Sequence, residues 1–177
     1  MMEASERTVQ AGSRLIGSGQ PCFVIAEVGV NHNGSLDLAL RSIDVAAEAG
    51  ADAVKFQTFR AEKLVTKAAQ TAKYQAENTG KQQTQFEMLK SLELSETDHG
   101  VIVEHCRARG IMFMSTPFDE DSATLLNSLG MTLFKVPSGE LTNLPLLQQI
   151  AGFGRPLVIS TGMSTLGDVE AAVTAVE

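Results

Sequence analysis

The stretch NSLGMTLFKV at residues 127–136 decides the fold, because it joins a helix end, a glycine and a short apolar strand. The same phrase, as EAGADAVKF, RARGIMFMS and GFGRPLVIS, ends at Phe56, Ser115 and Ser160. A glycine at this place is typical of a left-handed helix C-cap, after which the chain turns back into a strand. The repeat therefore predicts helices and strands that alternate along the chain.

A fifth strand, CFVIAEVGV, precedes these units. The strands are continuous apolar runs, as expected of a parallel sheet with both faces covered. Ser95 with Asp98, and Thr165 with Asp168, have the spacing of capping boxes, which mark helix starts. The predicted strands lie near 22–30, 52–58, 111–116, 133–137 and 156–161, and the predicted helices near 35–49, 95–109, 119–129, 143–151 and 166–177.

This alternation predicts an α/β fold, either a doubly wound sheet or part of a (β/α)₈ barrel. We expect residues 1–20 to form an N-terminal extension and residues 21–177 to form the α/β domain. A polar stretch at 60–94 interrupts the alternation. It indicates a solvated excursion with one or two short helices, and a lid over the strand ends is the alternative.

Composition and charge narrow the class of protein. A net charge of −7 argues against a nucleic-acid or anionic-membrane surface, because both favour basic residues. Cys22 and Cys106 lack the spacing of a metal site and indicate free thiols in a reducing compartment. The sequence shows no apolar core of a signal peptide and no apolar run of the ~18 residues that span a membrane. We therefore expect a soluble, cytoplasmic chain.

Polar side chains stand at the carboxyl end of every predicted strand, where α/β folds of both types build their active sites. Within the strand at 52–58, Ala53, Lys55 and Gln57 share one face by period-two alternation, so we predict that the lysine and the glutamine point inward. In strand order, the polar residues are Glu27; Lys55 and Gln57; Ser115 and Thr116; Lys135, Ser138 and Glu140; and Ser160 and Thr161.

The two strand lysines predict an anion site. A buried ammonium costs free energy unless a negative group lies beside it. An ion pair or a side chain extending out of the rim would explain one lysine, but Lys55 and Lys135 come with hydroxyl groups on neighbouring strands. Phosphates and carboxylates bind to this mixture of donors. Glu27 and Glu140 are either structural partners of the lysines or groups that orient a hydroxylated substrate or a metal-bound water.

The histidines are less informative. The sequence NHNG at 31–34 predicts a turn into a helix capped by Ser35. His32 lies near the active rim, and a substrate contact is a hypothesis for it. His99 and His105 are six residues apart on one predicted helix and do not share a face, which argues against a metal pair.

Five further segments are informative together: IAEVGVNHNG (25–34), GADAVKFQTF (50–59), STPFDE (115–120), FKVPSGELTNLPLL (134–147) and ISTGM (159–163). They resemble the sialic acid synthase family, which includes N-acetylneuraminate, legionaminate and pseudaminate synthases. The resemblance runs in register from about residue 14 to the end of the chain. It implies a (β/α)₈ TIM barrel, of which this chain holds about the first five βα units, followed by a small antifreeze-like domain and assembled as a swapped homodimer.

The resemblance also implies a reaction. The family condenses phosphoenolpyruvate with an N-acetylmannosamine-type sugar, with C–O cleavage and release of phosphate. Gln57 would contact the sugar, and Glu27 and Glu140 would be catalytic, near the reacting carbons and a metal-bound water. A divalent metal, Mn²⁺ or Mg²⁺, would polarise the sugar aldehyde. Phosphoenolpyruvate would be held by Lys55, Thr116, Lys135, Ser138 and Ser160.

The family's metal-binding histidines lie on the sixth and seventh barrel strands. We therefore expect no metal ligand in this chain, no synthase activity from it alone, and self-association through its open strand edges. Two other functions stay open. One is a different phosphate-binding barrel, a lyase or aldolase in which a lysine forms a Schiff base. The other is a non-catalytic half-barrel that binds an anion or a partner chain.

Overall fold

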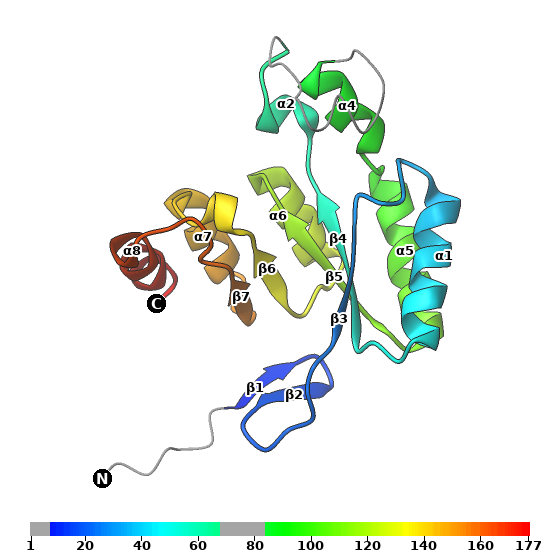
Figure 1. The fold of residues 1–177 in the computed structure, drawn as a ribbon, viewed down its shortest axis with the longest axis horizontal. Coiled ribbons are helices and arrows are strands. Elements are labelled where there is room, and N and C mark those ends of the chain that lie inside the picture. The colour runs from blue at the N-terminus through cyan, green and yellow to red at the C-terminus, as the bar shows by residue number, and fades with distance from the viewer. Residues whose placement is uncertain (1–7, 68–83) are drawn as a thin grey trace.

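The computed structural model describes residues 8–67 and 84–177, in which parallel strands alternate with outer helices (Figure 1). The strands are β3 (Ile25–Gly29), β4 (Ala53–Thr58), β5 (Met112–Pro117), β6 (Phe134–Val136) and β7 (Leu157–Ile159). The helices that follow them are α1 (Leu36–Glu48), α5 (Glu96–Arg109), α6 (Glu120–Ser128), α7 (Leu144–Ala151) and α8 (Leu166–Val176). All the predicted strands and helices are therefore present.

The strands form two parallel ladders. In the first, β4 lies between β3 and β5, and Lys55 is in register with Glu27 on one side and Met114 on the other. In the second, β6 pairs with β7. β5 and β6 lie side by side, and the backbone N–H of Ser115 donates to Sδ of Met131, which precedes β6, at 3.1 Å. Strands in chain order confirm the prediction of successive barrel strands, and the doubly wound alternative is wrong.

Side chains of the strands alternate between two layers. Val54 and Phe56 of β4 are buried in the main core beneath the helices. Ala53 faces the opposite way, into the interior of the partial barrel. Lys55 and Gln57 follow Ala53 in the period of two, so they occupy the inward face as predicted.

The partial barrel is open at its two edge strands, β3 and β7. Within residues 8–67 and 84–177, the outer edges of β3 and β7 have no strand partner. Val158, which lies on β7 between two partly buried residues that pack against the core, is 38% exposed. Both features agree with an incomplete barrel, in which the strands that would pair with these edges are missing.

A β-hairpin that the sequence analysis did not predict lies at the amino ends of the barrel strands (Figure 1). Ala11 in this hairpin is fully buried and packs with Met114 in a second, smaller core. Arg14 pairs with Asp52 at 2.6 Å and fixes the hairpin to the start of β4. The hairpin thus covers the lower end of the barrel interior. Within the predicted extension at 1–20, its strands are β1 (Thr8–Ala11) and β2 (Arg14–Gly17).

The predicted helix boundaries are confirmed by their caps. Both predicted capping boxes form, at the starts of α5 and α8. The hydroxyl of Ser35 accepts a hydrogen bond from the N–H of Leu38 at 3.3 Å, at the start of α1. Left-handed backbone follows four helices, at the predicted glycines Gly50, Gly110, Gly130 and Gly154.

The described parts of the polar excursion, residues 60–67 and 84–94, lie beyond the carboxyl ends of the strands (Figure 1). They contain α2 (Ala61–Leu64) and α4 (Gln85–Leu92), in agreement with the prediction of short helices. The start of the excursion is attached to α6 through Asp119. The Asp119 carboxylate accepts a hydrogen bond from the N–H of Arg60 at 2.9 Å and another from the N–H of Ser122 at 2.8 Å. Residues 68–83 lie outside the described residues, so the lid stays a hypothesis.

Neither cysteine forms a disulfide, as predicted, and Cys22 is exposed while Cys106 is buried. Burial raises the pKa of Cys106 to about 12, so its thiol stays protonated and unreactive at neutral pH. No helix in the described part of the chain has the length and apolar character needed to cross a membrane.

Candidate anion site

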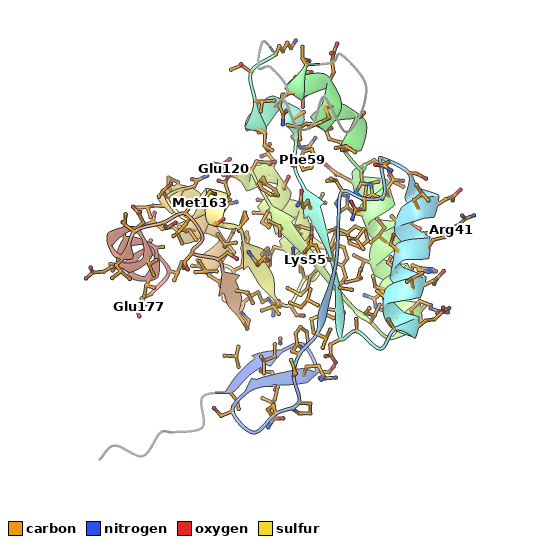
Figure 2. All side chains as sticks on the ribbon, viewed as in Figure 1. Arg41, Lys55, Phe59, Glu120, Met163 and Glu177 are labelled. Atoms are coloured by element: carbon orange, nitrogen blue, oxygen red, sulfur yellow. The ribbon has the colours of Figure 1, made fainter. Side chains whose placement is uncertain are left out.

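Lys55 and Glu27 form an ion pair across the paired strands β4 and β3. The Lys55 side chain is 13% exposed, whereas the Glu27 side chain is 50% exposed. Figure 2 shows Lys55 on the side of the β3–β4 ladder that faces β6. The negative partner that a buried ammonium requires is therefore Glu27.

Lys135 brings a second ammonium to the same interior from β6. Its Nζ donates to the backbone oxygen of Val136 at 2.7 Å. Burial lowers the pKa of Lys135, the positive charge of Lys55 lowers it further, and the carboxylate of Glu27 acts in the opposite direction. Three strands thus bring two cations and one carboxylate within electrostatic reach of one another.

Gln57 and Thr116 stand one step farther along the inward face, opposite each other on β4 and β5. A Cβ atom added to Gly29 would lie 3.2 Å from Oε1 of Glu27 and 3.6 Å from Nε2 of Gln57. The Gln57 amide and the Glu27 carboxylate therefore lie over the same glycine. Thr116 is 3% exposed, and its register with Gln57 places its side chain on the interior face of β5.

Ser138 and Ser160 come from the ends of β6 and β7. Ser138 begins a short 3₁₀ helix, η1 (Ser138–Glu140). The N–H of Ser160 donates to the oxygen of Val136 at 3.0 Å. A Cβ atom on Gly162 would lie 3.5 Å from Oγ of Ser138, so the loop after β7 packs against this serine. Both serines therefore flank the strand end that carries Lys135.

Glu140 has a different partner from Glu27. Its Oε2 accepts a hydrogen bond from Nδ2 of Asn143 at 2.8 Å, and the Asn143 side chain caps the start of α7. The ion pairs of the described residues include one between Glu27 and Lys55 but none between Glu140 and a lysine. Glu27 is therefore a structural partner of a lysine, whereas Glu140 binds Asn143 instead.

A buried network that the sequence analysis missed lies behind these strand ends. The hydroxyl of Thr58 lies 2.9 Å from Nε2 of His99 and 2.7 Å from Oγ of Ser115. Nδ1 of His99 lies 2.8 Å from the backbone oxygen of Ser95. Ser115, which was grouped with the hydroxyls of the anion site, is fully buried in this outer network. The sequence contained one signal for this network: the period-two alternation of β4 turns Thr58 toward the helices, where His99 lies.

His32 is fully buried behind the rim. Its Nδ1 accepts a hydrogen bond from the N–H of Gly34 at 3.1 Å, and its ring centroid lies 6.1 Å from that of Phe56. Its Nε2 has no hydrogen-bond partner among the described residues. Burial lowers the pKa of His32, and the nearby His99 lowers it further. This burial argues against a direct substrate contact for His32.

The family model described as the NeuB family matches residues 42–177. The chain belongs to the NeuB family. The N,N'-diacetyllegionaminic acid synthase of Legionella pneumophila is 53% identical over 166 residues, which cover 94% of this NeuB-family chain and 47% of that protein. The human N-acetylneuraminate-9-phosphate synthase is 38% identical over 154 residues, which cover 86% of the chain and 42% of that protein. The resemblance to sialic acid synthases is confirmed.

Solved structures agree with this family. The N-acetylneuraminic acid (sialic acid) synthetase of Leptospira borgpetersenii, in complex with citrate, superimposes with a TM-score of 0.83 at 30% identity, covering 97% of the NeuB-family chain and 55% of that chain. The spore coat polysaccharide biosynthesis protein SpsE of Bacillus subtilis gives a TM-score of 0.77 at 36% identity. The chain spans about half the length of the relatives it matches. It forms the first five βα units of a (β/α)₈ barrel.

The described residues of the NeuB-family chain do not suit a metal ion. Residues 8–67 and 84–177 contain no group of three or more His, Cys, Asp or Glu side chains that is arranged to hold one. The polar groups around Lys55 and Lys135 are ammonium, hydroxyl and amide donors with a single paired carboxylate, which favour an anion. We therefore assign no metal-dependent step to these residues.

We expect Glu27→Gln to raise the affinity of the NeuB-family chain for inorganic phosphate about tenfold, because it removes the carboxylate that now neutralises Lys55. Isothermal titration with phosphate measures the effect. Glu104→Gln is the control, since Glu104 pairs with Arg107 on the exposed surface of α5. An affinity of the Glu27 variant equal to or below that of the parent would contradict this electrostatic role.

We expect the free energy of unfolding to fall as the pH drops below about 6.5. Burial lowers the pKa of His99 against the opposing effects of Ser95, Asp98 and Glu96, and burial also lowers the pKa of His32. The unfolded chain binds protons at the ordinary histidine pKa of about 6.5, whereas the folded chain does not. This stability is therefore fully present above about pH 6.5 and is lost toward the lowered folded pKa.

The slope should be about 1.4 kcal/mol per pH unit for each histidine. Urea unfolding between about pH 7 and pH 5 measures it. Because His99→Gln removes one of the two titrating groups, its slope should be smaller, and a slope identical to that of the parent chain would count against the assignment.

Proposed function

We propose that this chain is the N-terminal barrel portion of a phosphoenolpyruvate-dependent synthase. The enzyme condenses phosphoenolpyruvate with an N-acylated amino sugar of the N-acetylmannosamine type, which yields a nonulosonic acid and phosphate. The observation that carries this proposal is the pair of inward lysines, Lys55 and Lys135, gathered around Glu27 in a member of the NeuB family.

The chemistry of phosphoenolpyruvate fits these groups. The molecule carries a phosphate and a carboxylate, and two ammonium groups match these two charges. Neutral donors complete the binding of the remaining oxygens. We assign this second role to Thr116, Ser138 and Ser160, which lie on the inward face or flank the end of β6.

In the proposed reaction, the methylene carbon of phosphoenolpyruvate bonds to the aldehyde carbon of the open-chain sugar. Water adds to C2, the enol carbon of phosphoenolpyruvate. The bond between C2 and the bridging oxygen of the phosphate ester then breaks, and phosphate leaves with that oxygen and the electron pair of the bond. Gln57 holds the sugar beside Glu27, and Glu27 and Glu140 exchange the protons that water and the new hydroxyl group give and take. In the whole protein, Mn²⁺ or Mg²⁺ would polarise the sugar aldehyde, with ligands outside the described residues.

The protein that contains this chain should release phosphate when it is mixed with phosphoenolpyruvate, N-acetylmannosamine and Mn²⁺, and a sugar acid should form in equal amount. Omission of the sugar should stop both. Phosphate release that does not depend on an amino sugar would contradict the proposal.

A Schiff-base lyase or aldolase is the second candidate, and one observation favours it. Burial and the charge of Lys55 lower the pKa of Lys135, as in lysines that react as nucleophiles. Borohydride treatment in the presence of pyruvate separates the two functions. We expect no covalent adduct, because the synthase uses Lys135 as a charged ligand; a stable adduct at Lys135 would favour the aldolase.

The family resemblance also supports proposals on the location, assembly and partners of the whole protein. We propose a cytoplasmic homodimer that acts on phosphoenolpyruvate and an amino sugar, without nucleic acid or membrane as a partner. The net charge of −7 supports the last point, because it disfavours polyanionic surfaces while leaving the local cations of the site free to act.

A further inference from the structure

We propose that His99 is a positioning residue for the anion site, which sets where β4 and β5 place Gln57 and Thr116. It does so through Thr58 and Ser115, which are the outward-facing neighbours of these two residues on the strands. The inference rests on the proposed function, because it assigns a role in the same binding site.

The contacts form one continuous chain from a helix to two strands. Nδ1 of His99 lies 2.8 Å from the oxygen of Ser95 at the start of α5, and Nε2 lies 2.9 Å from Oγ1 of Thr58. Thr58 in turn lies 2.7 Å from Oγ of Ser115. His99, Thr58 and Ser115 are 2%, 5% and 0% exposed, so bulk solvent has little access to these hydrogen bonds.

Which atom donates in each hydrogen bond follows from the group at the end of the chain of contacts, the backbone oxygen of Ser95. The oxygen of Ser95 only accepts, so Nδ1 of His99 carries the proton. A neutral ring then leaves Nε2 as an acceptor, to which Thr58 donates its hydroxyl proton, and Ser115 donates to Thr58. Each step depends on His99 staying neutral. Burial favours this state because it lowers the pKa of His99, whereas the hydrogen bond to Ser95 and the charges of Asp98 and Glu96 oppose it.

The network acts where the strand ladder ends. Thr58 is the last residue of β4, and Gln57 and Thr116 form the pair just before that end. The backbone of Ser115 is also held, because its N–H donates to Sδ of Met131. With their outward neighbours fixed, the two inward side chains have less freedom at strand ends that would otherwise fray.

His99 itself does not touch the interior of the barrel. It lines a cavity of about 290 Å³ together with Thr58, Ser95 and Ser122, and the residues that line this cavity include none of the anion-site residues. The imidazole therefore acts on the anion site through the strands and not by contact with a ligand.

The test compares two variants in the 177-residue chain, with phosphoenolpyruvate as the probe in isothermal titration. His99→Leu removes the acceptor and keeps similar bulk, so we expect about fivefold weaker binding. His99→Gln places an amide oxygen near the position of Nε2, so we expect binding within about twofold of the parent. His105→Gln is the control, because His105 lies on the same helix and pairs with Asp44 at 2.8 Å on the outer side.

Equal affinities of the leucine and glutamine variants would overturn the inference, since a packing role alone would favour leucine. Thr58→Val keeps the shape and removes the same hydrogen bond, and it replaces His99→Leu if that variant does not fold. It should weaken binding to the same extent. A His99→Leu/Thr58→Val double variant that loses no more than either single variant supports the network, and additive losses overturn it.

Failure of the proposed function is distinguishable from failure of this inference. If the parent chain does not bind phosphoenolpyruvate, the proposed function is wrong, and backbone amide resonances decide the inference. Signals of Gln57 and Thr116 that shift in His99→Leu but not in His99→Gln support the positioning role. Signals that stay in place in both variants overturn it.

Discussion

Lys135→Met should weaken the binding of phosphoenolpyruvate by about 30-fold to several thousand-fold, which corresponds to about 2–5 kcal/mol. Lys135 supplies one of the two inward ammonium groups, and Glu27 already neutralises part of the charge of Lys55. Without Lys135, the phosphate or the carboxylate of the ligand would be held in the interior with too little positive charge. Titration of the chain with phosphoenolpyruvate measures the loss.

The matched control for this experiment is Lys63→Met. It removes the same charge from α2, where Lys63 is 50% exposed and lies 3.6 Å from Asp121. Its effect on binding should be small, because an exposed and screened ion pair contributes little. Affinity of the Lys135 variant within twofold of the parent would remove Lys135 from the anion site.

The second large effect is expected for stability. Gly34→Ala should lower the free energy of unfolding by about 2–4 kcal/mol, the sum of a left-handed backbone cost and overpacking. Gly34 has a φ of +73°, and an added Cβ atom would lie 2.2 Å from the backbone oxygen of Ser91 in α4. Since that neighbour is backbone, the loop after β3 and the end of α4 would have to move apart. Urea unfolding measures the change.

Gly130→Ala separates the two contributions. Gly130 has a similar φ of +80°, but nothing lies within 4 Å of an added Cβ atom. It should therefore lose only the conformational part, about 1 kcal/mol. Equal losses at the two glycines would show that the contact between the loop at 31–34 and α4 is not tight in solution.

Most of the fold was predictable because its signals are local in the chain. Helix starts at Ser95 and Thr165 are encoded within four residues by capping boxes, and the helix ends by glycines such as Gly130. The hairpin at the N-terminus escaped prediction for the opposite reason. Its short strands are mostly exposed, and Ala11 is buried only because the barrel interior covers it.

The candidate site was predictable in part. Strand order and period-two alternation bring the carboxyl ends together, so Lys55, Gln57 and Lys135 could be placed inside before any tertiary contact was known. Whether these residues bind phosphoenolpyruvate stays a prediction. The alternation also places Ser115 opposite to Thr116, so only one hydroxyl of that pair faces the interior.

The sequence by itself determined the order of the barrel strands and their outer helices, the starts and ends of those helices, and the inward face of β4, because each depends on neighbours a few residues away. Only the tertiary structure decided which partners the polar groups choose. Glu27 pairs with Lys55 while Glu140 binds Asn143, and Thr58 meets His99 and Ser115 at separations of 41 and 57 residues. Such choices depend on the packing of α5 against β5 and on burial that limits access of water. A buried polar group must find whichever partner the fold places beside it.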